Sequence, residues 1–184
     1  MERVSRAGNK IAEAAGAFRF DFDGKTVLDV GSSTGGFTEY ALEHGAAKVI
    51  AVEIGKNQMK APLRFDSRVE LHEKTDIFGF STDEKIDAVV ADVSFVSLKD
   101  VLAHVRDYIA GPGAEYLVML KPQFEAKPEQ LNKGIVKNEK MRREIIKDFE
   151  FWLKNNGFLV LNKRDNETHG RHGNVERFYY LKAV

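Results

Sequence analysis

The chain has 184 residues, and its 28 basic side chains balance its 28 acidic ones. This length is typical of one domain, and the absence of cysteine excludes a disulfide framework and a thiolate metal site. The longest apolar runs are far shorter than the roughly 20 residues that cross a bilayer, and no apolar segment follows Met1. We therefore predict a single domain over residues 1–184, located in the cytoplasm.

Apolar residues recur at helical spacing in some segments and form short continuous runs in others. In chain order, the pattern predicts a helix over 5–18, a strand over 25–30, a helix over 37–43, strands over 47–53, 68–72 and 86–92, a helix over 97–109, a strand over 116–120, a helix over 138–154, and strands over 157–162 and 175–181. Strands alternating with helices indicate an α/β fold with a doubly wound, mostly parallel, seven-stranded sheet. Because the strands are apolar throughout, helices should cover both faces.

Chemically distinctive residues stand where four of the predicted strands end. They are Gly31, Glu53, Asp92 and Lys121. Parallel sheets bind ligands beyond the carboxyl ends of their strands, at the point where the strand order reverses. These four residues therefore predict a ligand site at one edge of the sheet.

A glycine-rich loop follows the first strand and leads into a helix. Glycine permits a tight turn and a close approach of ligand to backbone, and the helix start offers free N–H donors. Glu53 follows Gly31 by 22 residues, an offset at which an acid can accept both hydroxyls of an adenosine ribose. A nucleoside cofactor is expected here, on Gly31, Ser32, Ser33, Thr34, Gly35, Gly36 and Phe37. The alternative is a glycine turn without a ligand, with Glu53 as a capping carboxylate.

The loop has the pattern G-x-x-x-G-G, whereas dinucleotide sites usually have G-x-G-x-x-G. Asp29, just before the loop, would repel a pyrophosphate but would suit a cationic sulfonium with an ammonium group. S-adenosylmethionine is therefore favoured over NAD, and a nucleotide-dependent oxidoreductase is the disfavoured alternative. Thr75 and Asp76, after the third strand, are candidates for contact with the adenine.

Asp92 and Lys121 end neighbouring strands beside the expected methyl donor. A lysine and an aspartate in contact can each influence the protonation of the other, which suits proton transfer. Either residue could equally belong to an ordinary surface ion pair.

Five ordered motifs resemble those of the TlyA (haemolysin A) family, which belongs to the FtsJ-like ribose 2′-O-methyltransferases of RNA. They are VSRAGNK, DVGSSTGGFTEYALEHGA, ADVSFVSL, LKPQFEA and GNVERF. The resemblance covers nearly the whole chain. It implies a Rossmann-like class I methyltransferase fold, S-adenosyl-L-methionine as cofactor, and 2′-O-methylation of cytidine in ribosomal RNA.

The resemblance also implies a catalytic tetrad, which falls on Lys10, Asp92, Lys121 and Glu176. In that reading Lys121 accepts the proton of the ribose hydroxyl, and the positive charge of Lys10 favours a neutral Lys121. Asp92 and Glu176 would orient the two lysines and hold the hydroxyl near the methyl group. Positioning should dominate the rate, because a sulfonium is already an activated donor.

Two departures from the family pattern concern the RNA. Family members usually carry an N-terminal S4-like RNA-binding domain, which this sequence lacks, and Ala7 and Asn9 replace a glycine and a leucine. Residues 121–147 hold eight basic and four acidic side chains, whereas residues 66–100 hold four basic and nine acidic. RNA contacts are therefore expected on one face, at Arg3, Arg6, Lys133, Lys137, Arg143, Arg164 and Arg171.

Three further interpretations remain open at this point. His169 and His172 could form a metal-ligand pair, but without neighbouring carboxylates we expect them to be loop residues near the RNA. A membrane-active cytolysin, which the name haemolysin suggests, would need an apolar span or a strongly amphipathic surface helix, and the sequence has neither. A methyltransferase-fold protein that binds RNA without catalysis is the third.

Overall fold

A computed structural model of the chain describes residues 6–166 and 173–184. Within these residues, seven strands form one sheet in the order β3-β2-β1-β4-β5-β9-β8. The strands are β1 (Thr26–Val30), β2 (Lys48–Glu53), β3 (Val69–Glu73), β4 (Ala88–Ala91), β5 (Glu115–Leu120), β8 (Phe158–Asp165) and β9 (Arg177–Ala183). The pairs from β3 to β5 are parallel, and β9 is antiparallel to both β5 and β8. The predicted doubly wound, mostly parallel sheet is confirmed.

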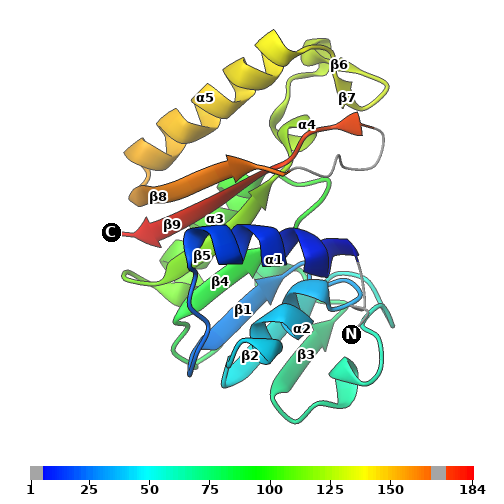
Figure 1. Cartoon of the computed structure of the whole chain (residues 1–184), viewed down its shortest axis with the longest axis vertical. Helices are drawn as coiled ribbons and strands as arrows, with labels where there is room; N and C mark the ends of the chain where they lie inside the picture. The colour runs from blue at the N-terminus through cyan, green and yellow to red at the C-terminus, as the bar shows by residue number, and fades with distance from the viewer. Residues whose placement is uncertain (1–5, 167–172) are drawn as a thin grey trace.

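Helices cover both faces of the sheet, as the uniformly apolar strands require (Figure 1). The helices are α1 (Arg6–Phe18), α2 (Gly36–Glu43), α3 (Leu98–Val105), α4 (Pro122–Glu125) and α5 (Glu139–Asn155), and a π-helical turn, η3 (Arg106–Ala110), extends α3. Buried residues of α1 and α2 form one hydrophobic core with one face of the sheet, and those of α3 and α5 form a second core with the other face.

Successive side chains of one strand point to opposite faces of the sheet and therefore pack into different cores. Val27 packs into the α1–α2 core, whereas Leu28 and Val30 pack into the α3–α5 core. In α5, the predicted apolar stripe includes the buried Ile145 and Phe149. Asn138 caps this helix, because its Oδ1 accepts a hydrogen bond from the Met141 N–H (3.0 Å).

Several short elements were absent from the sequence prediction. They are α4, the 3₁₀ turns η1 (Leu63–Phe65), η2 (Ile77–Gly79) and η4 (Pro128–Gln130), and a hairpin of β6 (Leu131–Asn132) and β7 (Ile135–Val136). The hairpin turns through Lys133 and Gly134, both with positive φ. Elements of two to four residues are too short for hydrophobic periodicity to reveal. The predicted 97–109 helix matches the extent of α3 and η3 together, although residues 106–110 are π-helical.

The strand order places the switch point between β1 and β4, which are neighbours in the sheet but distant in sequence. The carboxyl ends of the parallel strands lie at the same side of the molecule as the start of α1, α4 and the β6–β7 hairpin (Figure 1). Ligand sites of doubly wound sheets form at this position. The fold therefore brings Gly31, Glu53, Asp92 and Lys121 to one edge, as predicted.

Candidate active site

The loop after β1 has a backbone that only glycine adopts easily. Gly31 and Gly35 have φ values of 78° and 97°. A Cβ at Gly31 would lie 3.0 Å from the carbonyl oxygen of Asp92, and one at Gly35 would lie 2.6 Å from Cδ1 of Leu63. Glycine at position 31 therefore lets the loop pass close to the backbone of Asp92 after β4. Glycine at position 35 lets the residue before α2 pack against the side chain of Leu63.

Asp29, the last but one residue of β1, has a fully buried carboxyl. Its Oδ2 accepts a hydrogen bond from the Thr38 hydroxyl (2.6 Å), and its Oδ1 has no hydrogen-bond partner in the described part of the chain. Burial raises the pKa of Asp29 to about 7, and the nearby carboxylates of Asp92 and Glu53 add to the effect, against the hydrogen bond from Thr38. A carboxyl with an unused oxygen fits the ammonium group of S-adenosylmethionine.

Ser32 gives a second indication that the loop receives a ligand. Its hydroxyl is buried and has no hydrogen-bond partner among the described residues. Buried polar groups nearly always find partners, so the unpaired Oδ1 of Asp29 near the end of β1 and the unpaired hydroxyl of Ser32 in the following loop point to a polar ligand. The residues present therefore fit the methionine end of S-adenosylmethionine.

Glu53 ends β2 and is 7% exposed. Its Oε2 accepts from the Ser33 N–H (2.8 Å), and its Oε1 accepts from the Gly55 N–H (2.7 Å). Oε1 also accepts a long hydrogen bond from the Gln58 side-chain amide (3.5 Å). An ionised carboxylate has about four acceptor positions, so Oε2 can still accept a ribose hydroxyl, and Oε1 can accept one if it displaces the Gln58 amide. The predicted ribose acceptor is thus fixed in direction by two backbone donors.

The remaining predicted cofactor residues divide between the loop, the core and a turn. Thr34 and Gly36 lie in or beside the loop, whereas the side chain of Phe37 is buried in the core against Phe178. Asp76 caps η2, where its carboxylate accepts from the Phe78 N–H (3.1 Å). The Thr75 N–H donates to the Glu53 carbonyl (3.0 Å), which places this turn beside the end of β2. Contact of Thr75 and Asp76 with adenine stays a prediction.

Two lysine–carboxylate pairs stand next to this loop. Lys121 Nζ lies 2.6 Å from Asp92 Oδ1 and donates a hydrogen bond to the Ser94 hydroxyl (2.8 Å). Lys10, on α1, forms an ion pair with Oε2 of Glu176. Glu176 is buried, and the Asn166 amide also donates to its Oε2 (3.4 Å). All four side chains predicted for the tetrad are therefore engaged in these pairs.

Strand register explains why residues so distant in sequence meet. Leu120 pairs with Arg177 in the antiparallel β5–β9 ladder, so Lys121 and Glu176 occupy the next opposed positions. Asp92 follows the end of β4, and its N–H donates to the Val30 carbonyl beside Gly31 (3.2 Å). The two ion pairs thus lie at the same end of the sheet as the glycine loop.

Glu125, which the sequence did not single out, connects the Asp92 and Lys121 segments. From α4 its carboxylate accepts from the Ser97 hydroxyl (2.8 Å) and from the Leu98 N–H (2.5 Å) at the start of α3. Burial raises the pKa of Glu125, although these hydrogen bonds oppose the effect. Its partners are 27 and 28 residues away, so no local pattern could reveal them.

The predicted RNA-binding residues are distributed around this edge. Lys133 and Lys137 lie on or next to the β6–β7 hairpin, Arg143 is on α5 and Arg164 is on β8. Lys137 Nζ donates to the Glu129 carbonyl (2.7 Å). Arg3, Arg171, His169 and His172 lie outside the described residues, as does the side chain of Arg6.

Comparison with known proteins identifies the family. The model of the FtsJ-like methyltransferases matches residues 3–183. The chain belongs to this family. It is therefore a methyltransferase whose methyl donor is S-adenosylmethionine.

Relatives of the chain fall into two groups by name. It is 36% identical over 179 residues to the 23S rRNA (cytidine-2′-O)-methyltransferase TlyA of Campylobacter jejuni, covering 96% of this chain and 70% of that protein. It is 35% identical to Hemolysin A of Brachyspira hyodysenteriae, covering 96% of this chain and 75% of the relative. A solved structure described as a candidate hemolysin from Streptococcus thermophilus matches with a TM-score of 0.94 and 31% identity, over 100% of this chain and 68% of the other. Residues 6–166 and 173–184 contain no helix long and apolar enough to cross a membrane.

Proposed function

We propose that the chain transfers a methyl group to the ribose 2′-hydroxyl of a cytidine in ribosomal RNA. The observation that carries this proposal is that the Asp92–Lys121 and Lys10–Glu176 pairs lie at the same end of the sheet as the glycine loop, with Lys121 and Glu176 next to each other in the β5–β9 register. The Campylobacter jejuni relative, named for this reaction on 23S rRNA, supports the choice of RNA and nucleoside.

The chemistry needs a nucleophile held in line with a methyl group. S-adenosylmethionine supplies that methyl on a positively charged sulfur when it is bound. A ribose hydroxyl is a poor nucleophile, so the protein must place it and remove its proton. Once Lys121 has released its own proton to water, its Nζ is the group assigned to hold the hydroxyl oxygen and to accept its proton as a neutral amine.

The two carboxylates then hold the lysines in place. Asp92 holds Lys121 through an ion pair of 2.6 Å. Glu176, which lies opposite Lys121 at the next position of the β5–β9 register, holds Lys10 of α1. Glu176 compensates the positive charge of Lys10 through their ion pair. We therefore assign to Lys10 the role of orienting Glu176 and the backbone of the bound RNA.

The test is methylation of ribosomal RNA by the wild type and by Lys121→Ala and Lys121→Arg, with nucleosides identified by mass spectrometry after digestion. The wild type should produce 2′-O-methylcytidine, and both variants should lose the product while retaining S-adenosylmethionine binding. A matched control is Lys127→Ala, an exposed lysine after α4. RNA binding without methyl transfer by the wild type would favour the non-catalytic alternative. Leakage of liposomes caused by the protein would favour the membrane-active one.

A further inference from the structure

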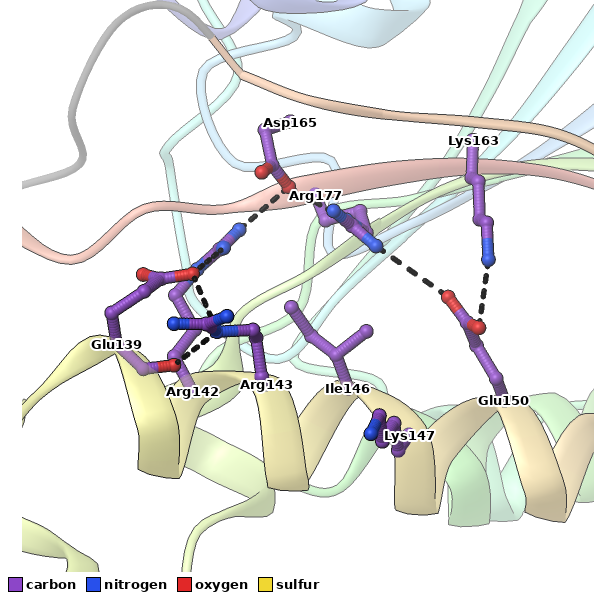
Figure 2. A pocket seen from close by; sticks show the side chains of 9 residues that line it. All are labelled: Glu139, Arg142, Arg143, Ile146, Lys147, Glu150, Lys163, Asp165 and Arg177. Carbon is purple, nitrogen blue, oxygen red and sulfur yellow. Dashed lines mark hydrogen bonds and ion pairs between the residues drawn. The ribbon is translucent and has the colours of Figure 1, made fainter.

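A groove with charged walls runs between α5 and strands β8 and β9 (Figure 2). Its volume is about 320 Å³, and it is lined by Glu139, Arg142, Arg143, Ile146, Lys147, Glu150, Lys163, Asp165 and Arg177. Five of these side chains are basic and three are acidic, whereas the whole chain is neutral. The groove therefore concentrates positive charge on a protein that has no net charge.

Two of the carboxylates in the groove are already held by several cations. Asp165 Oδ1 accepts from Arg142 Nη2 and from Arg177 Nε, both at 2.6 Å. Glu150 Oε2 accepts from Lys163 Nζ (2.7 Å) and its Oε1 from Arg177 Nη1 (3.5 Å). Although burial opposes ionisation of Asp165, the two arginines lower its pKa. These interactions connect α5 to β8 and β9 along the bottom of the groove.

The excess positive charge of the groove comes from Arg143 and Lys147, two exposed residues of α5. The side chain of Arg143 is 68% exposed and lies 3.8 Å from the exposed Glu139. Lys147, one turn later, is exposed and has no carboxylate partner among residues 6–166 and 173–184. Exposed cations that have only weak ion pairs are available to an anionic partner at little cost.

A second cavity of about 140 Å³ adjoins the groove. Glu139 and Arg142 line both cavities. The second cavity is also lined by Pro122, which follows Lys121, and by Val175, which precedes Glu176. Because Pro122 and Val175 are the chain neighbours of Lys121 and Glu176, the two cavities reach the same edge of the sheet as the tetrad, on its α5 side.

We propose that this groove binds the phosphates of the RNA strand next to the target nucleotide, with Arg143 and Lys147 as the contacting cations. The inference rests on the proposed function, because it assumes that the substrate is RNA. Phosphates are spaced along the strand at every nucleotide, so a charged groove that ends at the same edge of the sheet as the tetrad fits them without reading sequence. Lys147 was not among the RNA-binding residues predicted from the sequence.

The test compares the wild type with the double variant Arg143→Gln/Lys147→Gln. The matched control is Lys154→Gln/Lys182→Gln, which removes two exposed cations that line neither cavity. Ribosomal RNA binding is measured between 50 and 200 mM salt, and KM and kcat are measured for methyl transfer. Thermal unfolding and calorimetry with S-adenosylmethionine establish that each variant is folded.

Loss of two phosphate contacts should reduce the slope of log affinity against log salt by about 1.4 and raise KM about tenfold, with kcat within about twofold of the wild type. The control should match the wild type. A double variant that behaves as the control does would overturn the inference while the proposed function stands. A wild type that binds RNA but transfers no methyl would overturn the proposed function, and the salt slopes would then decide the groove separately.

Discussion

Asp29 provides a quantitative test of the cofactor site, because its buried carboxyl accepts one hydrogen bond from Thr38 and leaves its Oδ1 without a partner among the described residues. The buried side chain has a pKa of about 7, against an ordinary value of 3.8. At about 1.4 kcal/mol per pH unit, ionising Asp29 in the folded protein costs about 4 kcal/mol more than in the unfolded chain. The perturbation is Asp29→Asn, which keeps an acceptor for the Thr38 hydroxyl and cannot ionise.

The sign follows from proton binding. Between pH 4 and pH 7 the folded protein keeps a proton on Asp29 that the unfolded chain has lost, so the stability of the wild type falls as pH rises through this window. Relative to wild type, Asp29→Asn should therefore gain about 4 kcal/mol in free energy of unfolding from below pH 4 to above pH 7. Titratable groups that do not interact with Asp29 contribute equally to both proteins and cancel.

The assay is urea unfolding of both proteins without cofactor, at pH values from 4 to 8. A difference in unfolding free energy that does not change with pH would refute the assignment of a buried, proton-retaining Asp29. With S-adenosylmethionine present, a cation beside Asp29 favours its ionised form. Binding near pH 6 should then release a proton in the wild type and none in the variant, which calorimetry in buffers of different ionisation enthalpy can detect.

Three further predictions concern neighbouring residues. Glu53→Ala should weaken S-adenosylmethionine binding by about 2–4 kcal/mol, because a charged acceptor of two ribose hydroxyls is lost; unchanged affinity by calorimetry would remove Glu53 from the site. Lys121→Arg should be almost as inactive as Lys121→Ala in a methyl-transfer assay, because a guanidinium stays protonated; a variant with most of its activity would leave Lys121 as a positioning cation. Glu125→Ala should lower the free energy of unfolding by about 1–3 kcal/mol in urea titrations, because Leu98 N–H and the Ser97 hydroxyl lose their acceptor, and it should lower kcat more than Glu125→Gln does. Equal stability and equal kcat for the wild type, Glu125→Ala and Glu125→Gln would show that Glu125 does not connect the segments that carry Asp92 and Lys121.

The sequence predicted the sheet well, because the central parallel strands are mostly apolar runs with a polar or glycine residue at or just after their ends, whereas the partly polar β3 gave a weaker signal. β1 and β2 were predicted within a residue of their ends, and so were the strand-end positions of Asp92 and Lys121. The same reasoning could not reach Glu176, because the residues alone suggested only an edge-strand acid. Its role came from the family resemblance, and its position follows from the β5–β9 register, which no local pattern encodes.

Other features of the site depend on contacts between segments distant in sequence. Arg142 lies in a helix that reads as amphipathic, yet its side chain is buried because Asp165, 23 residues later, pairs with it. Phe37 follows the glycine loop and was predicted to contact the cofactor, yet its ring packs against Phe178. In both cases tertiary packing decides the direction of a side chain that local spacing leaves open.

The most direct test of the central claim is mass-spectrometric analysis of nucleosides from ribosomal RNA incubated with S-adenosylmethionine and either the wild type or Lys121→Ala. The proposal predicts a methylated cytidine whose added mass stays on the ribose fragment, present with the wild type and absent with the variant. A methyl group found on the base, or a product of equal amount with Lys121→Ala, would contradict it.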